Sequence, residues 1–194
     1  MKLGKITRTL LAASLASLMS MTALADKYVI DTEGAHAAIQ FKIKHLGYSW
    51  LVGRFNTFKG EFVYDADNLA ASQVNVVIDT KSIDSNHAER DKHLRGSDFL
   101  EVSTYPKATF ESKKVIPGAD GKFQIVGDLS LHGVTKSVTI DASHIAGGND
   151  PWGGYREGFE GTTTIALKDF GINFNLGPAS ETVELSLYVE GIKK

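Results

Sequence analysis

The side chains best suited to metal or acid–base chemistry are the six histidines, of which His87 and His93 are closest in sequence. Glu89 and Asp91 lie between them. Zinc hydrolases commonly place two histidines four residues apart, on one face of a helix. Here the separation is six residues, so the two rings would leave different faces, although His87 and Asp91 would share one. A metal-dependent hydrolase that uses His87, Asp91 and His93 is therefore an alternative function and not the first expectation.

A short helix explains the same segment more simply. Asn86 can cap its start, with Glu89 three residues later, and Gly96 stands where a helix would end. Glu89 and His93 are four residues apart, a spacing at which opposite charges support a helix. We expect Leu94, Phe99 and Leu100 to pack this segment against the rest of the protein.

Other catalytic patterns are missing from the sequence. It contains no cysteine, no G-x-S-x-G motif and no S-x-x-K motif. The absence of cysteine excludes disulfides, thiol catalysis, iron–sulfur clusters and cysteine-bound zinc. The glycine-rich stretch 147–154 lacks the spacing of a phosphate-binding loop and is interpreted as a turn. We expect neither an enzyme nor a cofactor.

Residues 1–25 are typical of a cleaved signal peptide. Lys2, Lys5 and Arg8 precede an apolar run, and Ala23-Leu24-Ala25 forms a cleavage signature. The run is shorter than the roughly 20 residues of a membrane-spanning helix. The sequence therefore predicts export to the periplasm, with 26–194 as a single domain and no stable membrane insertion.

The charge balance argues against nucleic acid as a partner. The chain has 21 basic and 23 acidic residues, a formal net charge of −2. Because residues 1–25 carry three basic and no acidic side chains, the exported chain keeps 18 basic and 23 acidic residues, a net charge of −5. A surface that binds duplex nucleic acid needs a basic stripe instead.

Apolar and polar residues alternate with a period of two along most of 26–194, the pattern of antiparallel strands with one wet face. Eight segments show it: 36–45, 55–64, 74–79, 108–112, 123–131, 134–142, 161–167 and 183–190. Turn residues at 117–121 and 132–133 join neighbouring segments as hairpins. Because closing a sheet removes its edges, we expect an all-β fold, an extended antiparallel eight-stranded barrel with a short helix between strands. On pattern alone a β sandwich remains an alternative.

The apolar faces of these strands would line the interior. A barrel of about eight strands is just wide enough for packed side chains or one small ligand. The alternatives are thus a ligand-binding cavity and a filled core, the latter in a stress protein without a ligand. The residues expected to line a cavity are Phe41, Phe58, Phe62, Phe110, Phe123, Ile125, Leu129, Ile140, Ile165 and Leu185.

Several multi-residue motifs follow one another along 26–194, among them FKIKH at 41–45, HAERDKHL at 87–94, YPKATF at 105–110 and KDFGI at 168–172. In this order they resemble the YceI-like family of bacterial periplasmic proteins. The resemblance implies an extended, lipocalin-like barrel whose apolar interior holds a polyisoprenoid chain, and it implies no catalytic residues. The expected function is that of a periplasmic lipid-binding protein, monomeric or homodimeric, which carries or sequesters a long isoprenoid of polyprenyl or quinone-precursor type.

The strand pattern fails in three places, and we expect these to flank the mouth of the cavity. They are the 40–53 turn, the 86–100 helix segment and the 147–154 loop. Arg90 or Arg95 would then bind a polar head group by charge-assisted hydrogen bonds. The alternative for both arginines is an ion pair on the helix surface.

Overall fold

A computed structural model describes residues 25–194, so the predicted signal peptide lies outside the described residues except for Ala25. In this part of the chain, eleven strands form one antiparallel sheet. They are β1 (Asp26–Ile30), β2 (Ala38–His45), β3 (Ser49–Phe55), β4 (Phe58–Tyr64), β5 (Gln73–Asp79), β6 (Ile83–Asp84), β7 (Lys107–Pro117), β8 (Lys122–Leu131), β9 (Val134–Asn149), β10 (Tyr155–Ala166) and β11 (Thr182–Lys193). The helices are α1 (Ala88–Leu94) and the 3-10 turns η1 (Leu69–Ala71), η2 (Thr80–Ser82), η3 (Leu167–Phe170) and η4 (Pro178–Ser180).

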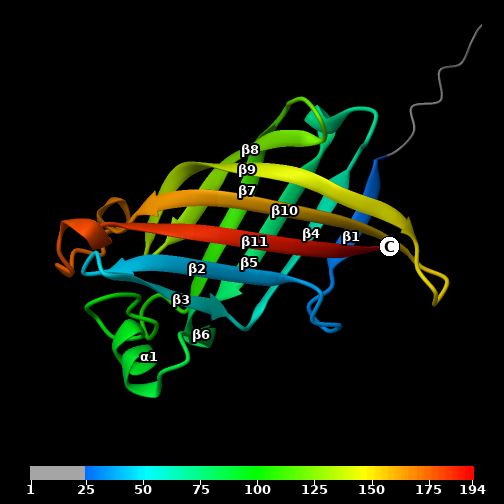
Figure 1. Cartoon of the computed structure of the whole chain (residues 1–194). Helices are drawn as coiled ribbons and strands as arrows, with labels where there is room; N and C mark the ends of the chain where they lie inside the picture. Colours follow the sequence, from blue (N-terminus) through cyan, green and yellow to red (C-terminus); the bar gives the residue numbers. More distant parts are fainter. Residues whose placement is uncertain (1–24) are drawn as a thin grey trace, which may run out of the picture.

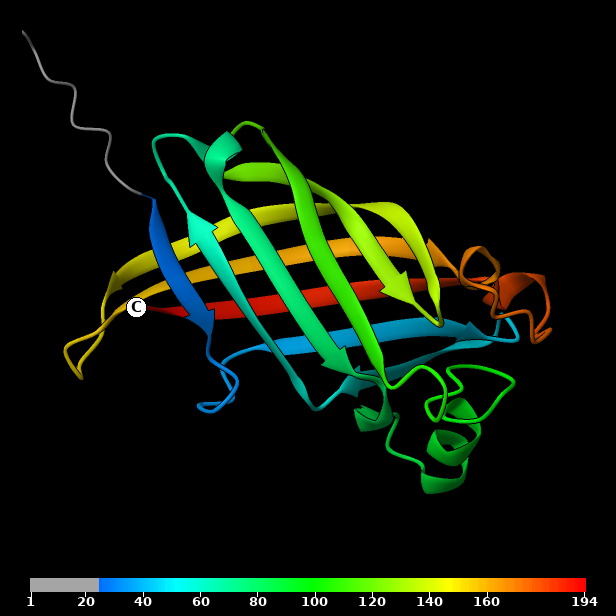
Figure 2. The ribbon, with the colours of Figure 1, turned by 180° about the vertical axis from the view of Figure 1, so that it is seen from behind.

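Eight strands close into a barrel in the order β1-β4-β5-β7-β8-β9-β10-β11, because β1 pairs with both β4 and β11. Residues 191–193 of β11 pair with β1, whereas residues 183–188 pair with β2. The sheet therefore branches along β11, and β2, β3 and β6 spread away beneath the barrel at the end next to α1 (Figures 1 and 2). The predicted eight-stranded antiparallel barrel with one short helix is confirmed, and the sandwich alternative is wrong.

All eight segments predicted from alternation are strands, but β1, β3 and β6 were not predicted. In β3, Trp50 and Val52 are exposed on the outer face while Leu51 packs against the core. With apolar residues on both faces, β3 shows no alternation. Of the predicted strands, β2 lies in the branch, and its place in the ring is taken by the short strand β1.

The predicted helix is present, but its cap is one residue later than expected. Asn86 has a left-handed backbone, with φ of 61°, and an N-cap needs an extended one. His87 is extended, and its Nδ1 accepts the backbone N–H of Arg90 at 3.2 Å. The expected pairing of Glu89 with His93 is also replaced, because His93 Nε2 lies 2.9 Å from Asp98 Oδ2.

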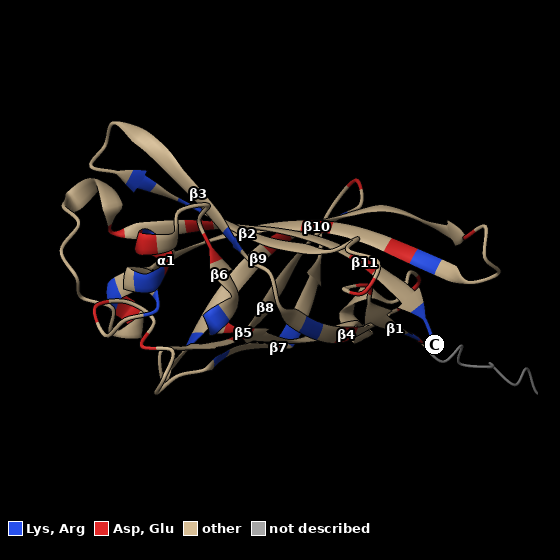
Figure 3. Cartoon of the chain, turned by 90° about the horizontal axis from the view of Figure 1, so that it is seen from below, with Lys and Arg blue, Asp and Glu red and all other residues tan. Residues whose placement is uncertain are grey.

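The barrel interior holds two clusters of buried apolar side chains. The smaller one fills the end at which β1 closes the ring, where the Tyr28 and Phe62 rings stack 4.9 Å apart. Phe159 packs edge-on against Phe62 at 5.4 Å and against Tyr64 at 5.0 Å. The larger cluster extends from the middle of the barrel to the end covered by α1. Acidic and basic residues are both spread along the ribbon (Figure 3).

Within residues 25–194, no helix has the length and apolar content that a membrane crossing requires.

Candidate functional site

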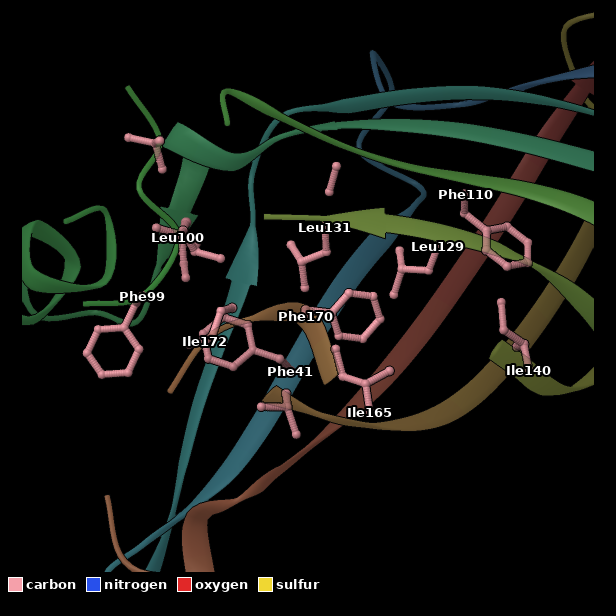
Figure 4. Close-up of a cluster of buried hydrophobic side chains, with 14 residues drawn as sticks. Phe41, Phe99, Leu100, Phe110, Leu129, Leu131, Ile140, Ile165, Phe170 and Ile172 are labelled. Atoms are coloured by element: carbon pink, nitrogen blue, oxygen red, sulfur yellow. The ribbon is translucent and has the colours of Figure 1, made fainter. Parts of the chain in front are cut away.

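A cavity of about 440 Å³ lies within the larger cluster, at the barrel end next to α1. The inward faces of the strands supply most of its wall, as the period-two pattern requires. From the strands it is lined by Ile39, Phe41, Ile43, Leu51, Phe55, Ile78, Ile83, Ala108, Leu129, Leu131, Ile165, Val183 and Leu185. Several of these side chains converge from different strands in Figure 4.

The end of the cavity is covered by segments outside the ring of strands. Leu94 of α1 and the following Phe99 and Leu100 cover one side, and all three belong to the larger cluster, as expected from the sequence. The connection from β10 to β11 covers another side with Leu167, Ile172 and Leu176. The cavity is thus enclosed by the barrel wall and by two irregular segments of the chain.

Four of the ten residues predicted to line a cavity lie in this wall: Phe41, Leu129, Ile165 and Leu185. Phe110 and Ile140 are buried in the same cluster and Ile125 packs against it, but none of these three reaches the cavity. Phe62 and Phe58 belong to the cluster at the closed end. Phe123 is also buried, 6.1 Å from Phe159 between ring centroids.

The alternation of apolar and polar residues identifies which side chains point inward, but not their position along the barrel axis. This is why only some of the predicted residues line the cavity. Sequence reasoning therefore missed wall residues in the unpredicted strand β3, Leu51 and Phe55. It also missed Leu167 and Ile172, although both flank or belong to the KDFGI motif that carried the family resemblance.

A glycine positions the aromatic ring at the centre of the wall. Phe41 and Gly53 are directly opposite each other on β2 and β3. A Cβ atom on Gly53 would lie 2.3 Å from Cζ of Phe41. The ring therefore lies flat across the neighbouring strand, a close approach that only glycine permits.

Polar side chains border the cavity at the α1 end. Arg90 is one of them, and its guanidinium is fixed by Ser85, with Nε donating to Oγ at 2.7 Å and Nη2 donating to the carbonyl oxygen. Buried Asp91 holds Ser85 in turn by accepting its backbone N–H at 2.8 Å. Arg95 lies elsewhere, because it donates to the carbonyl oxygens of Lys81 and Ile83. Of the two arginines considered for a head group, Arg90 alone borders the cavity.

Residues of two of the three segments expected at the mouth border the cavity. Lys44, His45 and Leu46 of the 40–53 turn border the cavity, as do residues of the 86–100 segment. The prediction for the 147–154 loop is wrong, because this loop joins β9 to β10 at the opposite end of the barrel, near the C-terminus (Figure 1).

The residues of the alternative metal site do not converge. His87 caps the helix, Asp91 accepts hydrogen bonds from Ser85, and His93 pairs with Asp98. A metal centre needs several of its ligand atoms around one point. The hydrolase interpretation therefore finds no support at this segment.

A different group does converge within residues 25–194: the ligand atoms of Asp31, His36 and Glu190 lie within 4.8 Å of one another. The guanidinium of Arg156 is already there, with Nη1 donating to Asp31 Oδ2 at 2.7 Å and also to Glu190. Hydrogen bonds from His36 and Arg156 lower the pKa of Asp31 to about 2. Arg156 is a cation of the chain itself that pairs with these carboxylates, so the cluster is interpreted as an ion network that joins β10, β11 and the loop after β1.

Comparison with known proteins identifies relatives of this chain. A model of the YceI-like domain matches residues 28–191. A UPF0312 protein of Yersinia pestis is 57% identical over 190 residues, which cover 97% of this chain and 98% of the relative. The crystal structure of a Campylobacter jejuni YCEI protein is 29% identical with a TM-score of 0.68, and the match covers 79% of this chain and 91% of that one.

A polyisoprenoid binding domain from Saccharophagus degradans has a TM-score of 0.64 at 17% identity, over 89% of this chain and all of that one. At this identity the likeness extends to the fold alone. The family model, in contrast, runs from β1 to β11 and so includes every strand of the ring and every wall of the cavity. The chain belongs to the YceI-like domain family.

Proposed function

We propose that this protein is a binding protein that holds an isoprenoid lipid chain in the cavity at the α1 end of its barrel. The observation that carries the proposal is the cavity wall, which is built almost wholly from aliphatic and aromatic side chains. The polyisoprenoid binding domain from Saccharophagus degradans, which shares the fold, supports an isoprenoid as the ligand class.

The size of the cavity sets the length of chain that it encloses. An apolar protein cavity of about 150 Å³ accommodates benzene, which corresponds to about 25 Å³ for each carbon atom. On this scale, 440 Å³ holds about 18 carbons, or three to four isoprene units. A polyprenyl chain longer than this would extend through the mouth or widen the barrel.

This length is sufficient for useful affinity. At about 0.8 kcal/mol for each buried CH₂ group, some 18 carbons contribute about 14 kcal/mol before costs. Ordering a flexible chain and restricting its motion remove a large part of this. If about half remains, the dissociation constant lies near 10 μM without any polar contact. Arg90 at the mouth is placed to add a charge-assisted hydrogen bond to a polar or anionic head group.

The other two functions considered from the sequence are less favoured. Two of the polar side chains at the cavity are already engaged: Ser180 Oγ donates to the carbonyl oxygen of Lys44, and His93 pairs with Asp98. This arrangement favours a binding site over a catalytic one. A stress protein with a filled core is disfavoured by the cavity itself.

The proposal includes a periplasmic location, which rests on the predicted signal peptide at residues 1–25. In this location the protein would carry or sequester a lipid that is poorly soluble in water. Cell fractionation, with the mature N-terminus identified by mass spectrometry, tests this part. We expect the mature chain to begin at Asp26 and to be found in the periplasmic fraction.

Native mass spectrometry of the protein purified without detergent tests ligand class. We expect a bound species whose mass, after solvent extraction, fits an isoprenoid. The delipidated protein is then titrated with prenols of increasing length. Affinity is expected to rise with length and to level off near the capacity of the cavity. Failure to take up any prenol would refute the proposal, and equal affinity for straight-chain alcohols of the same length would refute the isoprenoid class.

A further inference from the structure

Large apolar side chains are exposed on the hairpin formed by β2 and β3. Tyr48 at its turn is 88% exposed and Val52 is 56% exposed, and Leu46 before them and Trp50 between them are exposed as well. Single exposed apolar residues are common, but a contiguous group on one protruding hairpin indicates contact with another surface. We call Leu46, Tyr48, Trp50 and Val52 the hairpin patch.

The surroundings of the hairpin patch are basic, although the whole chain has a net charge of −2. Residues 38–55, which form the hairpin, contain two lysines and one arginine, and no aspartate or glutamate. Arg54, at the far end of β3, lies 3.8 Å from Asp84. In Figure 3 the hairpin accordingly has blue segments and no red ones. Nζ of Lys42 and Nζ of Lys44 lie 4.5 and 4.2 Å from the centroid of the Trp50 ring. Lys42 also forms an ion pair with Glu184 of β11, at 2.9 Å.

The hairpin patch adjoins the mouth of the cavity. Leu46 belongs to both, and Lys44 and His45 also border the cavity. The carbonyl oxygen of Lys44 accepts a hydrogen bond from Oγ of Ser180, which fixes the hairpin to the connection between β10 and β11. On that connection Phe174 is partly exposed, and its ring lies 5.0 Å from the ring of Phe99 in the cavity wall. Exposed apolar side chains therefore lie on both the hairpin and the connection, two segments that border the cavity.

We propose that the hairpin patch docks this protein on the surface of a bilayer that contains anionic lipids, with the cavity mouth turned toward the membrane. Tyrosine and tryptophan are favoured at the membrane interface, and nearby lysines add electrostatic attraction to an anionic surface. The inference rests on the proposed function, since an isoprenoid must leave one membrane and enter another. Docking at the mouth spares the chain a passage through water.

A second copy of the chain is the main competing occupant. Among residues 25–194, β3 pairs along this edge only with β6, at Arg54 and Phe55. The rest of the edge has no strand partner in this part of the chain and could extend the sheet of another molecule. Such pairing would bring the basic hairpins of both copies together, and like charges at short range are unfavourable. The charge therefore favours an anionic lipid surface over a second copy.

Vesicle flotation of the purified protein tests docking. We expect it to float with phosphatidylcholine vesicles that contain phosphatidylglycerol and to bind pure phosphatidylcholine less. The double variant Tyr48→Ser/Val52→Ser should lower partitioning on the order of tenfold. Its matched control is Ile145→Ser/Trp152→Ser, which removes side chains that are 62% and 77% exposed at the other end of the barrel. Equal losses in both variants, or no loss in the first, would refute docking through the hairpin.

The two tryptophans of the chain, Trp50 and Trp152, report the orientation. With brominated lipid in the vesicles, fluorescence of Trp50 in the Trp152→Phe variant should be quenched. Fluorescence of Trp152 in the Trp50→Phe variant should not be. Quenching of Trp152 instead would show that the protein docks by its closed end, contrary to the proposal.

Two further measurements separate the proposals. Tyr48 and Val52 do not line the cavity, so their double variant should still bind a short prenol in solution. If the unmodified protein binds vesicles but no prenol, docking stands and the proposed function fails. Sedimentation tests the competing occupant: a dimer that the Tyr48→Ser/Val52→Ser variant abolishes, without vesicle binding by the unmodified protein, would overturn the membrane proposal.

Discussion

Replacing Ala108 with phenylalanine should shorten the isoprenoid chain that the cavity can hold. Ala108 is buried on β7 and lines the cavity, so the added ring would enter the space assigned to the ligand. Six added carbons occupy about 150 Å³ at about 25 Å³ each. This is about a third of the 440 Å³ cavity and leaves room for about 12 carbons.

The loss of affinity follows from the displaced chain. About six carbons that can no longer be buried represent about 5 kcal/mol before costs. If half of this is offset by the freedom that the displaced part regains, a chain of about 20 carbons loses about 2.4 kcal/mol, or roughly 50-fold in affinity. A ten-carbon prenol still fits and should bind as before.

Titration of delipidated protein with prenols of ten and 20 carbons measures this selectivity. The control is Ala38→Phe, which adds the same ring on β2 outside the cavity wall and should leave both affinities unchanged. The thermal unfolding temperature of the ligand-free Ala108→Phe variant should be no lower than that of the parent protein, because the ring fills empty apolar space. Equal loss of both prenols, or loss of neither, would show that this cavity is not the binding site.

Three other substitutions test the wall, the mouth and the closed end. Gly53→Ala should cost about 1 to 3 kcal/mol in denaturant unfolding, because its Cβ would lie 2.3 Å from Phe41 Cζ; an unchanged midpoint would contradict the close approach. Arg90→Gln should weaken binding of a prenyl diphosphate several-fold but not of the matching prenol, and an equal effect on both would exclude a head-group contact. Asp31→Asn should lower the free energy of unfolding at neutral pH by on the order of 2 kcal/mol, because folding lowers the pKa of Asp31 from 3.8 to about 2. The control Asp26→Asn, at an exposed ion pair, should have little effect. The difference in unfolding free energy between the parent and Asp31→Asn should be full above about pH 4 and vanish as pH falls toward 2. Urea unfolding across this pH range measures it, and a difference that persists at pH 2 would contradict the reasoning.

Much of the barrel could be predicted from the sequence because each strand buries one face. Phe41 lies between Gln40 and Lys42, Phe62 follows Glu61, and both phenylalanines are buried. Their roles differ because Phe62 stacks on Tyr28 of β1, a contact set by the long-range register between β1 and β4. No local pattern contains that register, so alternation could not separate the cavity wall from the packed end.

The error at the mouth has a simpler cause. The 86–100 segment and the 147–154 loop both interrupt the strand pattern, and this similarity suggested a common place. Antiparallel strands place successive turns at alternate ends. From the 86–100 segment, strands β7, β8 and β9 must be crossed to reach the 147–154 loop. An odd number of crossings puts the two at opposite ends, so counting the strands could have located the loop.

The two ends of the barrel differ in how many contacts hold the strands together. At the closed end, β1 pairs with β4 and β11, aromatic rings pack against one another, and Arg156 binds Asp31, Asp150 and Glu190. At the mouth, β3 is joined to β6 by only two residue pairs. Local opening is least costly where few contacts must break. Under the proposed function, lipid exchange at the mouth would proceed by separating β3 from β6, while the pairing that closes the barrel stays intact.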